Sequence, residues 1–492
     1  MQQPIKRDDL LPTKRTATPL QEIPSKRTRL RSYSGFHHTE AEILTPSSVE
    51  ALAAIFAQAQ HQGRRMSLRA SGFSLDTQAL NDDLSISLLA LHQIKQIDTE
   101  QGTLVVEPGA LWGDVAKALL PTGWMTPIMP SSPMISVGGT LSSNGVSRMS
   151  PIHGREGEHV LQFRLLTPRG EVLICSRQQN AELFYAAIGG FGYFGAITEI
   201  TYRLQRLDQR RNVETLIDKF DQYDDIFDRL RDWTRYPDGW DSVSAPLLCG
   251  PNYQRGMIFR SRYTDKPTGP LYFPHRQHHP LRVPTEMLMR RSWFSQRIWR
   301  MIYRFFAPQN QTFVDPLLGY SFFFDTQRKM RRFTEFFGIP SPLIQQGFVF
   351  EGEGGRAFLK EEAAPLLQAH RIWPLLTDAL YLPADAFLFS PNYQRAGFAV
   401  TMAFVDLRGD RFERTRAVLE QLSERCLARG GRLWLTKNAF ASPACLRAMF
   451  EATRSPILRL KQQADPHHLI RSPFVEKIFA HPTHEGVDHA QS

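Results

Sequence analysis

The chain contains the segment Pro130-Ser-Ser-Pro-Met-Ile-Ser-Val-Gly-Gly-Thr-Leu-Ser-Ser-Asn144, in which serine, threonine and glycine predominate. A second segment of similar composition, Arg69-Ala-Ser-Gly-Phe-Ser-Leu-Asp-Thr-Gln78, lies earlier in the chain. Glycine lets a backbone N–H approach a ligand closely, and serine or threonine adds a hydroxyl donor. Either segment alone is equally consistent with a tight turn. Together they predict a site at which converging N–H groups bind a diphosphate.

The surrounding sequence predicts short helices and strands in irregular order. Ser47–Gln62 has helical apolar periodicity with Ser48 as its cap, and Val160–Thr167 and Glu171–Cys175 predict a hairpin. Because strands and helices do not alternate regularly, we expect an α+β fold rather than a doubly wound parallel sheet. Gly190-Phe-Gly-Tyr-Phe-Gly195 matches G-x-G-x-x-G, but it follows a predicted helix, which argues against a Rossmann loop.

The length of 492 residues predicts two or three domains. From about Gln205 aromatic residues and arginine become frequent, and strand-like runs at Leu343–Phe350 and Gly397–Val405 predict an α+β substrate or cap domain. We expect five parts. They are a disordered basic arm over 1–35, a first domain over 36–206, the cap domain over 207–430, a C-terminal segment over 431–480 that packs back on the first domain, and a flexible tail over 481–492.

The net charge of +10 is concentrated at the N-terminus, where the first 33 residues contain eight Lys or Arg and three Asp or Glu. We interpret this stretch as a solvated tail and expect no nucleic-acid partner. The basic aromatic segment Glu286–Phe306 is interpreted as an amphipathic helix, although a peripheral membrane contact stays open.

The spacing of the cysteines and the length of the apolar runs indicate in which cellular compartment the protein is expected. No apolar run reaches the roughly 18–20 residues of a membrane helix, and the N-terminus lacks the apolar core of a secretory signal. The four cysteines fit neither a disulfide framework nor a zinc site, so we expect a cytoplasmic protein without a metal.

A family resemblance extends over about Leu44–Leu207. Ile135–Ser147 resembles the second flavin loop of the vanillyl-alcohol-oxidase/PCMH flavoprotein family, and Arg69–Gln78 resembles the first. The match continues at His153-Gly154 and through Gly189-Gly-Phe-Gly-Tyr-Phe-Gly-Ala-Ile197. The resemblance implies a two-part PCMH-type FAD-binding domain, with FAD accepting a hydride at flavin N5.

The resemblance also implies which residues contact FAD. These are Arg69, Ser71, Gly72, Phe73, Ser74 and Gln78 of the first loop, Pro130, Ser131, Ser132, Ser136, Gly138, Gly139, Ser142 and Ser143 of the second, and Gly154, Ile197 and Lys437. Many relatives attach FAD through a histidine at the Phe73 position or a cysteine at the Ser143 position. Since neither linking residue is present, we expect non-covalent FAD.

The C-terminal segment resembles two branches of that family. Gly430-Gly-Arg-Leu-Trp-Leu-Thr-Lys437 and Lys461-Gln-Gln-Ala-Asp-Pro466 are similar to the closing segments of the decaprenylphosphoryl-ribose oxidase branch and of the alditol and sugar-lactone oxidases. The resemblance implies that Lys437 anchors flavin or substrate, or stabilises a developing alkoxide. Gln345 resembles a substrate-loop glutamine and Tyr393 a pocket residue, and a purely structural role remains an alternative for both.

We therefore predict an FAD-dependent oxidoreductase that removes a hydride from a CH–OH group of a sugar-like, polyol-like or lipid-linked small molecule. Relatives carry histidine at the Val146 position and cysteine at the Thr401 position, so the sequence leaves the substrate open. It also leaves open whether oxygen, a quinone or a protein is the electron acceptor. The alternatives are C–N oxidation of the cytokinin-dehydrogenase type, and a non-catalytic basic interaction protein on a degenerate flavin fold.

Overall fold

The structure is a computed structural model. It describes residues 25–232, 239–249, 253–269, 297, 301, 303–304, 311–322, 344–352, 354–404, 410–438 and 440–479. The helix expected over Glu286–Phe306 lies almost entirely outside the described residues, as does the expected tail over 481–492.

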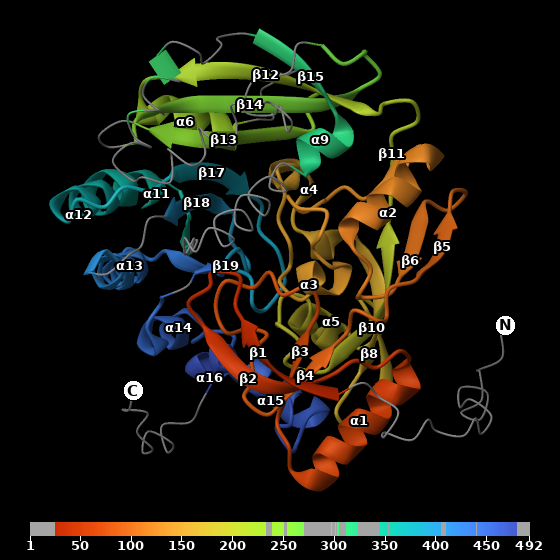
Figure 1. Cartoon of the computed structure of the whole chain (residues 1–492). Coiled ribbons are helices and arrows are strands. Elements are labelled where there is room, and N and C mark those ends of the chain that lie inside the picture. The colour runs from red at the N-terminus through yellow and green to blue at the C-terminus, as the bar shows by residue number, and fades with distance from the viewer. Residues whose placement is uncertain are drawn as a thin grey trace.

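The N-terminal part contains a four-stranded and a five-stranded sheet, and β7 (Trp124–Met125) pairs with β11 (Gln205–Arg206) in a two-stranded sheet (Figure 1). A four-stranded sheet has the order β1 (Ser25–Arg31), β2 (His38–Leu44), β4 (Leu84–Ser87) and β3 (Met66–Arg69). A five-stranded antiparallel sheet has the order β5 (Ile94–Asp98), β6 (Thr103–Val106), β10 (Ala196–Arg203), β8 (Val160–Leu166) and β9 (Val172–Ser176). Mixed helices and strands confirm the predicted α+β class for this part.

Helix α1 (Val49–Gln62) covers the four-stranded sheet (Figure 1). Its sequence places Leu52, Ile55 and Phe56 on one buried face, which packs in one cluster with Met66 of β3. The Ser48 hydroxyl accepts a hydrogen bond from the Ala51 N–H, so the predicted cap is confirmed.

The expectation of a disordered arm over 1–35 is wrong from Ser25 onward. Residues Ser25–Arg31 form β1, which pairs with β2 along its whole length. Lysine and arginine still point to solvent on this edge strand, whereas Leu30 is buried beside Ala41. The charge pattern therefore reflects one exposed face of a strand, which composition alone does not distinguish from disorder.

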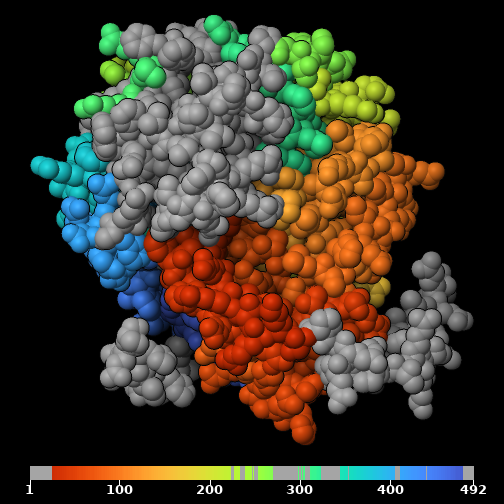
Figure 2. Space-filling model, viewed as in Figure 1, coloured from red at the N-terminus to blue at the C-terminus, as the bar shows by residue number. Residues whose placement is uncertain are grey.

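An eight-stranded sheet forms the upper half of the molecule (Figure 1). Its order is β15 (Gln311–Pro316), β12 (Asn212–Phe220), β14 (Arg255–Thr264), β13 (Ser242–Cys249), β17 (Leu376–Leu382), β18 (Gly397–Phe404), β16 (Ile344–Phe350) and β19 (Arg432–Asn438). On the face shown in Figure 2, the N-terminal residues in red and orange occupy the lower surface, and residues of β12–β15 in green reach the top.

The two faces of this sheet have different neighbours around β16. The amide nitrogen of Gln346 donates to the Ser423 hydroxyl of α13 (Asp410–Ala428) at 2.7 Å, so helices cover that face. On the opposite face Val349, Ala399 and Trp434 pack against Val146 of the N-terminal part. Because side chains alternate along a strand, Gln345 and Gly347 belong to the face that meets the N-terminal part.

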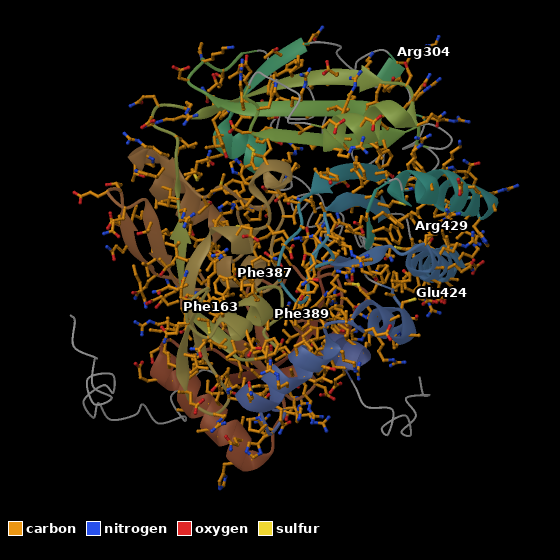
Figure 3. All side chains as sticks on the ribbon, turned by 180° about the vertical axis from the view of Figure 1, so that it is seen from behind. Phe163, Arg304, Phe387, Phe389, Glu424 and Arg429 are labelled. Carbon is orange, nitrogen blue, oxygen red and sulfur yellow. The ribbon has the colours of Figure 1, made fainter. Side chains whose placement is uncertain are left out.

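The chain after β19 returns to the N-terminal part through α14 (Pro443–Met449), α15 (Arg454–Ala464) and α16 (Pro473–Phe479). The fully buried Lys461 donates to the carbonyl oxygens of Tyr193 and Ile470, at 2.7 and 2.9 Å, and to Asp465 at 2.6 Å. Phe387 and Phe389 follow β17 in the chain (Figure 3). The Phe387 ring contacts Phe184 of the N-terminal part, and the Phe389 ring contacts Phe479 of α16.

Candidate functional site

The two predicted loops are joined through two serines. The Ser136 backbone N–H donates to the Ser71 hydroxyl at 2.9 Å, and the Ser71 hydroxyl donates to the Ser136 hydroxyl at 3.2 Å. The first loop directly follows β3, and the second leads into the short helix α3 (Val137–Leu141). The structure therefore brings the two segments into a single site.

Glycine is required where these loops approach other atoms closely. Gly72 has a φ of +72°, and a Cβ atom there would lie 2.4 Å from a guanidinium nitrogen of Arg69. A Cβ at Gly138 would lie 2.5 Å from the Cβ of Pro108. At Gly138 a side chain would clash with Pro108, and at Gly72 the positive φ disfavours any residue other than glycine.

The first loop presents unpaired donors. Within the part of the chain that the structure describes, the backbone N–H groups of Gly72, Phe73, Ser74 and Leu75 have no hydrogen-bond acceptor. The buried side-chain nitrogen of Asn144, at the end of the second loop, also lacks an acceptor among the described residues. Such donors match the diphosphate and polar edges of FAD, so the residues present fit this cofactor.

Several of the residues predicted to contact FAD form hydrogen bonds that stabilise the loops themselves. Arg69 donates to the carbonyl oxygens of Arg31 and Ala79, at 3.0 and 3.3 Å, and burial lowers the pKa of its guanidinium. Ser143 donates back to carbonyl oxygens of its own helix, whereas Ile197 is buried in the core. The contacts of Arg69 and Ser143 hold the loops in shape, and among the contacts of the described residues none joins Gly154 or Ile197 to the loop donors.

Gln78 connects the first loop to the C-terminal strand. Its amide nitrogen donates to the Leu435 carbonyl oxygen of β19 at 3.4 Å, and its amide oxygen accepts from the Asp76 N–H at 3.1 Å. The predicted flavin loop and the strand that carries Lys437 are thus in direct contact.

Lys437 and Gln345, two residues that the sequence analysis names separately as candidates, lie side by side. The Lys437 ammonium donates to the Gln345 side-chain oxygen at 2.8 Å. A Cβ atom at Gly347 would lie 2.9 Å from the Cβ of Lys437, so glycine leaves room for the lysine beside the sheet. Burial lowers the pKa of Lys437, and the charge of Asp378 opposes this shift.

Tyr393 is not part of this pair. Among the described residues, its hydroxyl accepts from the Gln394 amide at 3.1 Å and its carbonyl oxygen accepts from Arg432 at 3.2 Å. Asn392, two residues after Ser390, instead accepts from the buried Arg155 at 2.7 Å. The Ser390–Arg395 motif therefore ties the chain after β17 to the N-terminal part, and its residues Ser390 and Pro391 also line a hollow near the second loop.

A small hollow lies between the second loop and β19. Its lining includes Ser143, Asn144, Arg155, Phe389 and Trp434. Arg155 stacks over the Trp434 ring, 5.6 Å from the ring centroid, and pairs with Asp385 at 3.2 Å. The hollow connects the unpaired Asn144 donor with the strand that carries Lys437.

Two charged residues, Asp378 near Lys437 and Arg148 near Asp378, were not predicted from the sequence. Asp378 of β17 pairs in register with Thr401 of β18, which in turn pairs with Gly347. Burial raises the pKa of Asp378 to about 6, and the charges of Lys437 and Arg148 oppose this shift. Arg148 follows the second flavin loop and lies over the Tyr320 ring, 5.2 Å from its centroid. Since these residues lie far apart in the chain, the sheet register and the contact with the N-terminal part bring them together.

Comparison with known proteins supports the cofactor. Residues 41–176 match the model of a family described as FAD binding domain. This region is therefore a PCMH-type FAD-binding domain, and FAD is its cofactor.

The most informative relatives are plant enzymes. Cytokinin dehydrogenase 8 of Oryza sativa subsp. indica is 34% identical over 153 residues, which are 31% of this chain and 29% of the relative. Cytokinin dehydrogenase 1 of Arabidopsis thaliana is 31% identical over 170 residues, with 33% of this chain and 30% of the relative covered. Cytokinin dehydrogenase 2 of Arabidopsis thaliana is 28% identical over 227 residues, which are 45% of this chain and 43% of the relative.

This chain thus matches less than half the length of these relatives. These relatives are named as cytokinin dehydrogenases, which corresponds to the alternative of C–N oxidation and not to the sugar and polyol oxidases. Among the described residues, every helix is too short or too polar to cross a membrane.

Proposed function

We propose that the protein is an FAD-dependent oxidoreductase that oxidises a CH–OH group of a small polar substrate. The observation that carries the proposal is the Lys437–Gln345 pair at 2.8 Å, on the sheet face that meets the FAD-binding domain. A cation held at this place favours a substrate oxygen that gains negative charge as its carbon is oxidised.

FAD supplies the acceptor for the hydride, and this chain's residues bind and orient the reactants. Gln345 accepts a hydrogen bond from Lys437 and so fixes the direction of the ammonium group. The remaining protons of that group are then available to a substrate hydroxyl. Because burial lowers the pKa of Lys437, its charge is poorly solvated and interacts more strongly with a nearby oxygen.

We propose further that FAD is bound without a covalent link. The Phe73 ring stacks on Tyr33, with centroids 4.8 Å apart and an interplanar angle of 22°. The Ser143 hydroxyl donates to carbonyl oxygens of its own helix. At both positions where members of the family carry a residue covalently bound to FAD, this chain has a side chain that cannot form such a bond. Both side chains instead contact other residues of this chain.

A second candidate is oxidation of a C–N bond. It is favoured by the names of the relatives and by the carboxyl group of Asp378, which suits a protonated amine. The two cations Lys437 and Arg148 near that carboxyl would repel a cationic substrate, so we place this function second.

The test is anaerobic bleaching of the FAD-loaded protein with xylitol, gulonolactone and the cytokinin isopentenyladenine. We expect a polyol or lactone to bleach the flavin faster than the cytokinin. Bleaching by the cytokinin alone would favour the second candidate, and reoxidation by oxygen or a quinone would then identify the acceptor. A protein that binds no FAD would support a non-catalytic interaction protein.

A further inference from the structure

The hollow between the second loop and β19 is lined by segments that are distant in the chain. Residues 143–144, at the end of the second loop, form one wall, and residues 434–436 of β19 form another. The Leu435 carbonyl oxygen accepts from Gln78 of the first loop at 3.4 Å, and Lys437 follows directly in the chain. The hollow therefore lies where both flavin loops approach the strand that carries the lysine.

Most polar side chains of the hollow are already engaged with other groups of the protein. The Ser143 hydroxyl donates to carbonyl oxygens of its own helix, and the Ser390 hydroxyl donates to Asp385. Arg155 pairs with the same carboxylate at 3.2 Å. The buried side-chain nitrogen of Asn144 differs, because no described residue accepts a hydrogen bond from it. This amide is a donor that remains for a ligand.

The orientation of the Asn144 amide is fixed by its neighbours. Its side-chain oxygen accepts the Gly157 N–H at 3.0 Å, and because a backbone N–H can only donate, the nitrogen must lie on the other side. The Asn144 backbone has a φ of +48°, and its N–H donates to the Leu141 carbonyl oxygen at 3.0 Å. A Cβ atom at Gly189 would lie 3.2 Å from the Asn144 Cβ, so glycine leaves room for the asparagine. The donor is thus held in place before a ligand binds.

The surroundings of this amide suit an acceptor at the edge of a flat ring. Phe191, Phe389 and Trp434 contribute aromatic side chains to the lining, and Phe389 is labelled in Figure 3. Because the hollow is narrow, the group that reaches the amide is small, such as a carbonyl oxygen of a larger ligand. The isoalloxazine ring of FAD carries two such oxygens. The charged diphosphate is better matched by the backbone N–H groups of the first loop.

We infer that the Asn144 side chain donates a hydrogen bond to a carbonyl oxygen of the flavin ring and thereby raises the reduction potential of the bound cofactor. Reduction by two electrons adds negative charge to the ring and its carbonyl oxygens. A donor at this place therefore binds reduced flavin more tightly than oxidised flavin. Because the contact involves the cofactor alone, it is the same for an alcohol and for an amine substrate.

The test compares Asn144→Asp with Asn180→Asp, both loaded with FAD. Asn144→Asp keeps an oxygen for the Gly157 N–H and suits the left-handed backbone, but it replaces the donor by a second oxygen. Asn180, just before α5 (Ala181–Ala187), has a similar φ of +49°. Its amide donates to the Ile174 carbonyl oxygen at 2.8 Å and does not line the hollow. Asn180→Asp therefore removes a donor from the same backbone conformation elsewhere.

Reduction by dithionite in the presence of a reference dye measures the potential without any substrate. We expect Asn144→Asp to lose about tenfold or more of its preference for reduced over oxidised flavin, which lowers the two-electron potential by about 30 mV. Fluorescence titration of the apoprotein should also give a dissociation constant for oxidised FAD that is raised several-fold. Asn180→Asp should have the wild-type value of both quantities.

A second variant, Asn144→Gly, removes the donor without adding charge and tolerates the positive φ, so it should also lower the potential. A wild-type potential in whichever of the two Asn144 variants folds would overturn the inference. An unchanged potential together with a raised KM for the best substrate would do so as well, because the amide would then contact the substrate. Failure of every substrate to bleach wild-type flavin would instead contradict the proposed function and would leave these potentials unaffected.

Discussion

The hydroxyl of Ser71 accepts the backbone N–H of Ser136 at 2.9 Å and thereby joins the two flavin loops. A second hydrogen bond, between the two hydroxyls, has a length of 3.2 Å. This relationship explains why two segments that are separate in the chain act as one binding site. The side chain that makes both hydrogen bonds belongs to the first loop.

Ser71→Ala should therefore weaken FAD binding. Loss of two hydrogen bonds of roughly 1 kcal/mol each predicts a dissociation constant raised by about tenfold or more. Titration of the apoprotein with FAD, followed by flavin fluorescence, measures this. Ser25→Ala, which removes an exposed hydroxyl on β1, is the control and should bind FAD like wild type. Equal affinities of the two variants would show that the Ser71 contact does not organise the site.

Lys437→Met should slow flavin reduction by about 10²-fold or more, because it removes the cation beside the developing substrate charge. Lys437→Arg should not restore the rate, since a planar guanidinium does not reproduce the geometry of the ammonium. The matched control is Lys117→Met on α2 (Trp112–Leu119), where the lysine is exposed. Stopped-flow absorbance under anaerobic conditions checks all three, and wild-type rates in Lys437→Met would remove this lysine from the mechanism.

Tyr33→Ala should accelerate the loss of FAD. The turn between β1 and β2 holds the first loop through the Tyr33–Phe73 stack and through the Tyr33 N–H, which donates to the Ser74 carbonyl oxygen at 2.7 Å. An aromatic pair contributes about 0.5–1.5 kcal/mol, which corresponds to roughly two- to tenfold in the FAD dissociation rate. Tyr33→Phe keeps the stack and should behave like wild type. No difference between alanine and phenylalanine would mean that the stack does not retain the cofactor.

Glu156→Gln should change how stability depends on pH. Glu156 is buried beneath the second loop, where it accepts from Thr140 at 2.9 Å and from Tyr202 at 2.6 Å, and burial raises its pKa to about 7. Because the pKa is higher in the folded state, its contribution to stability is complete below about pH 4.5 and is lost as pH rises through about 7. The loss is on the order of 3 kcal/mol.

Thermal unfolding of wild type and Glu156→Gln at about pH 5 and pH 8 measures this contribution. The wild-type free energy of unfolding should fall between the two pH values by more than that of the glutamine variant. Parallel pH profiles would contradict a raised pKa for this carboxyl group.

Local chemistry made part of the molecule predictable from the sequence. The flavin loops and α1 depend on glycine, a serine cap and short motifs, whose signals lie within a few residues. The contact between Lys437 and Gln345 joins residues far apart in the chain and was not predicted. The strands β12 and β14 were not predicted, because charged residues interrupt their apolar runs, acidic ones in β12 and arginines in β14. These residues form cross-strand ion pairs such as Arg262 with Glu214 at 2.7 Å. Ion pairs of this kind stabilise a strand only once its distant partner is in register.

Asp378 and Arg148 show why the site itself was only half predicted. Neither residue belongs to a recognisable motif, and each gains its electrostatic environment from a sheet register and a domain contact. Tyr393 was assigned to the pocket because it lies in a recognisable motif, yet that motif serves the contact between Arg155 and Asn392. The sequence motif thus indicated the region of the chain that lies near the site, whereas the fold determined which side chains contact one another.

The central claim, that this chain is a flavoenzyme with non-covalent FAD, is tested most directly by the visible spectrum before and after acid precipitation. The purified protein should be yellow, and the colour should pass into the supernatant, with anaerobic bleaching by a hydroxyl substrate before precipitation. A yellow pellet would contradict the non-covalent attachment. A colourless protein that cannot be reconstituted with FAD would contradict the account as a whole.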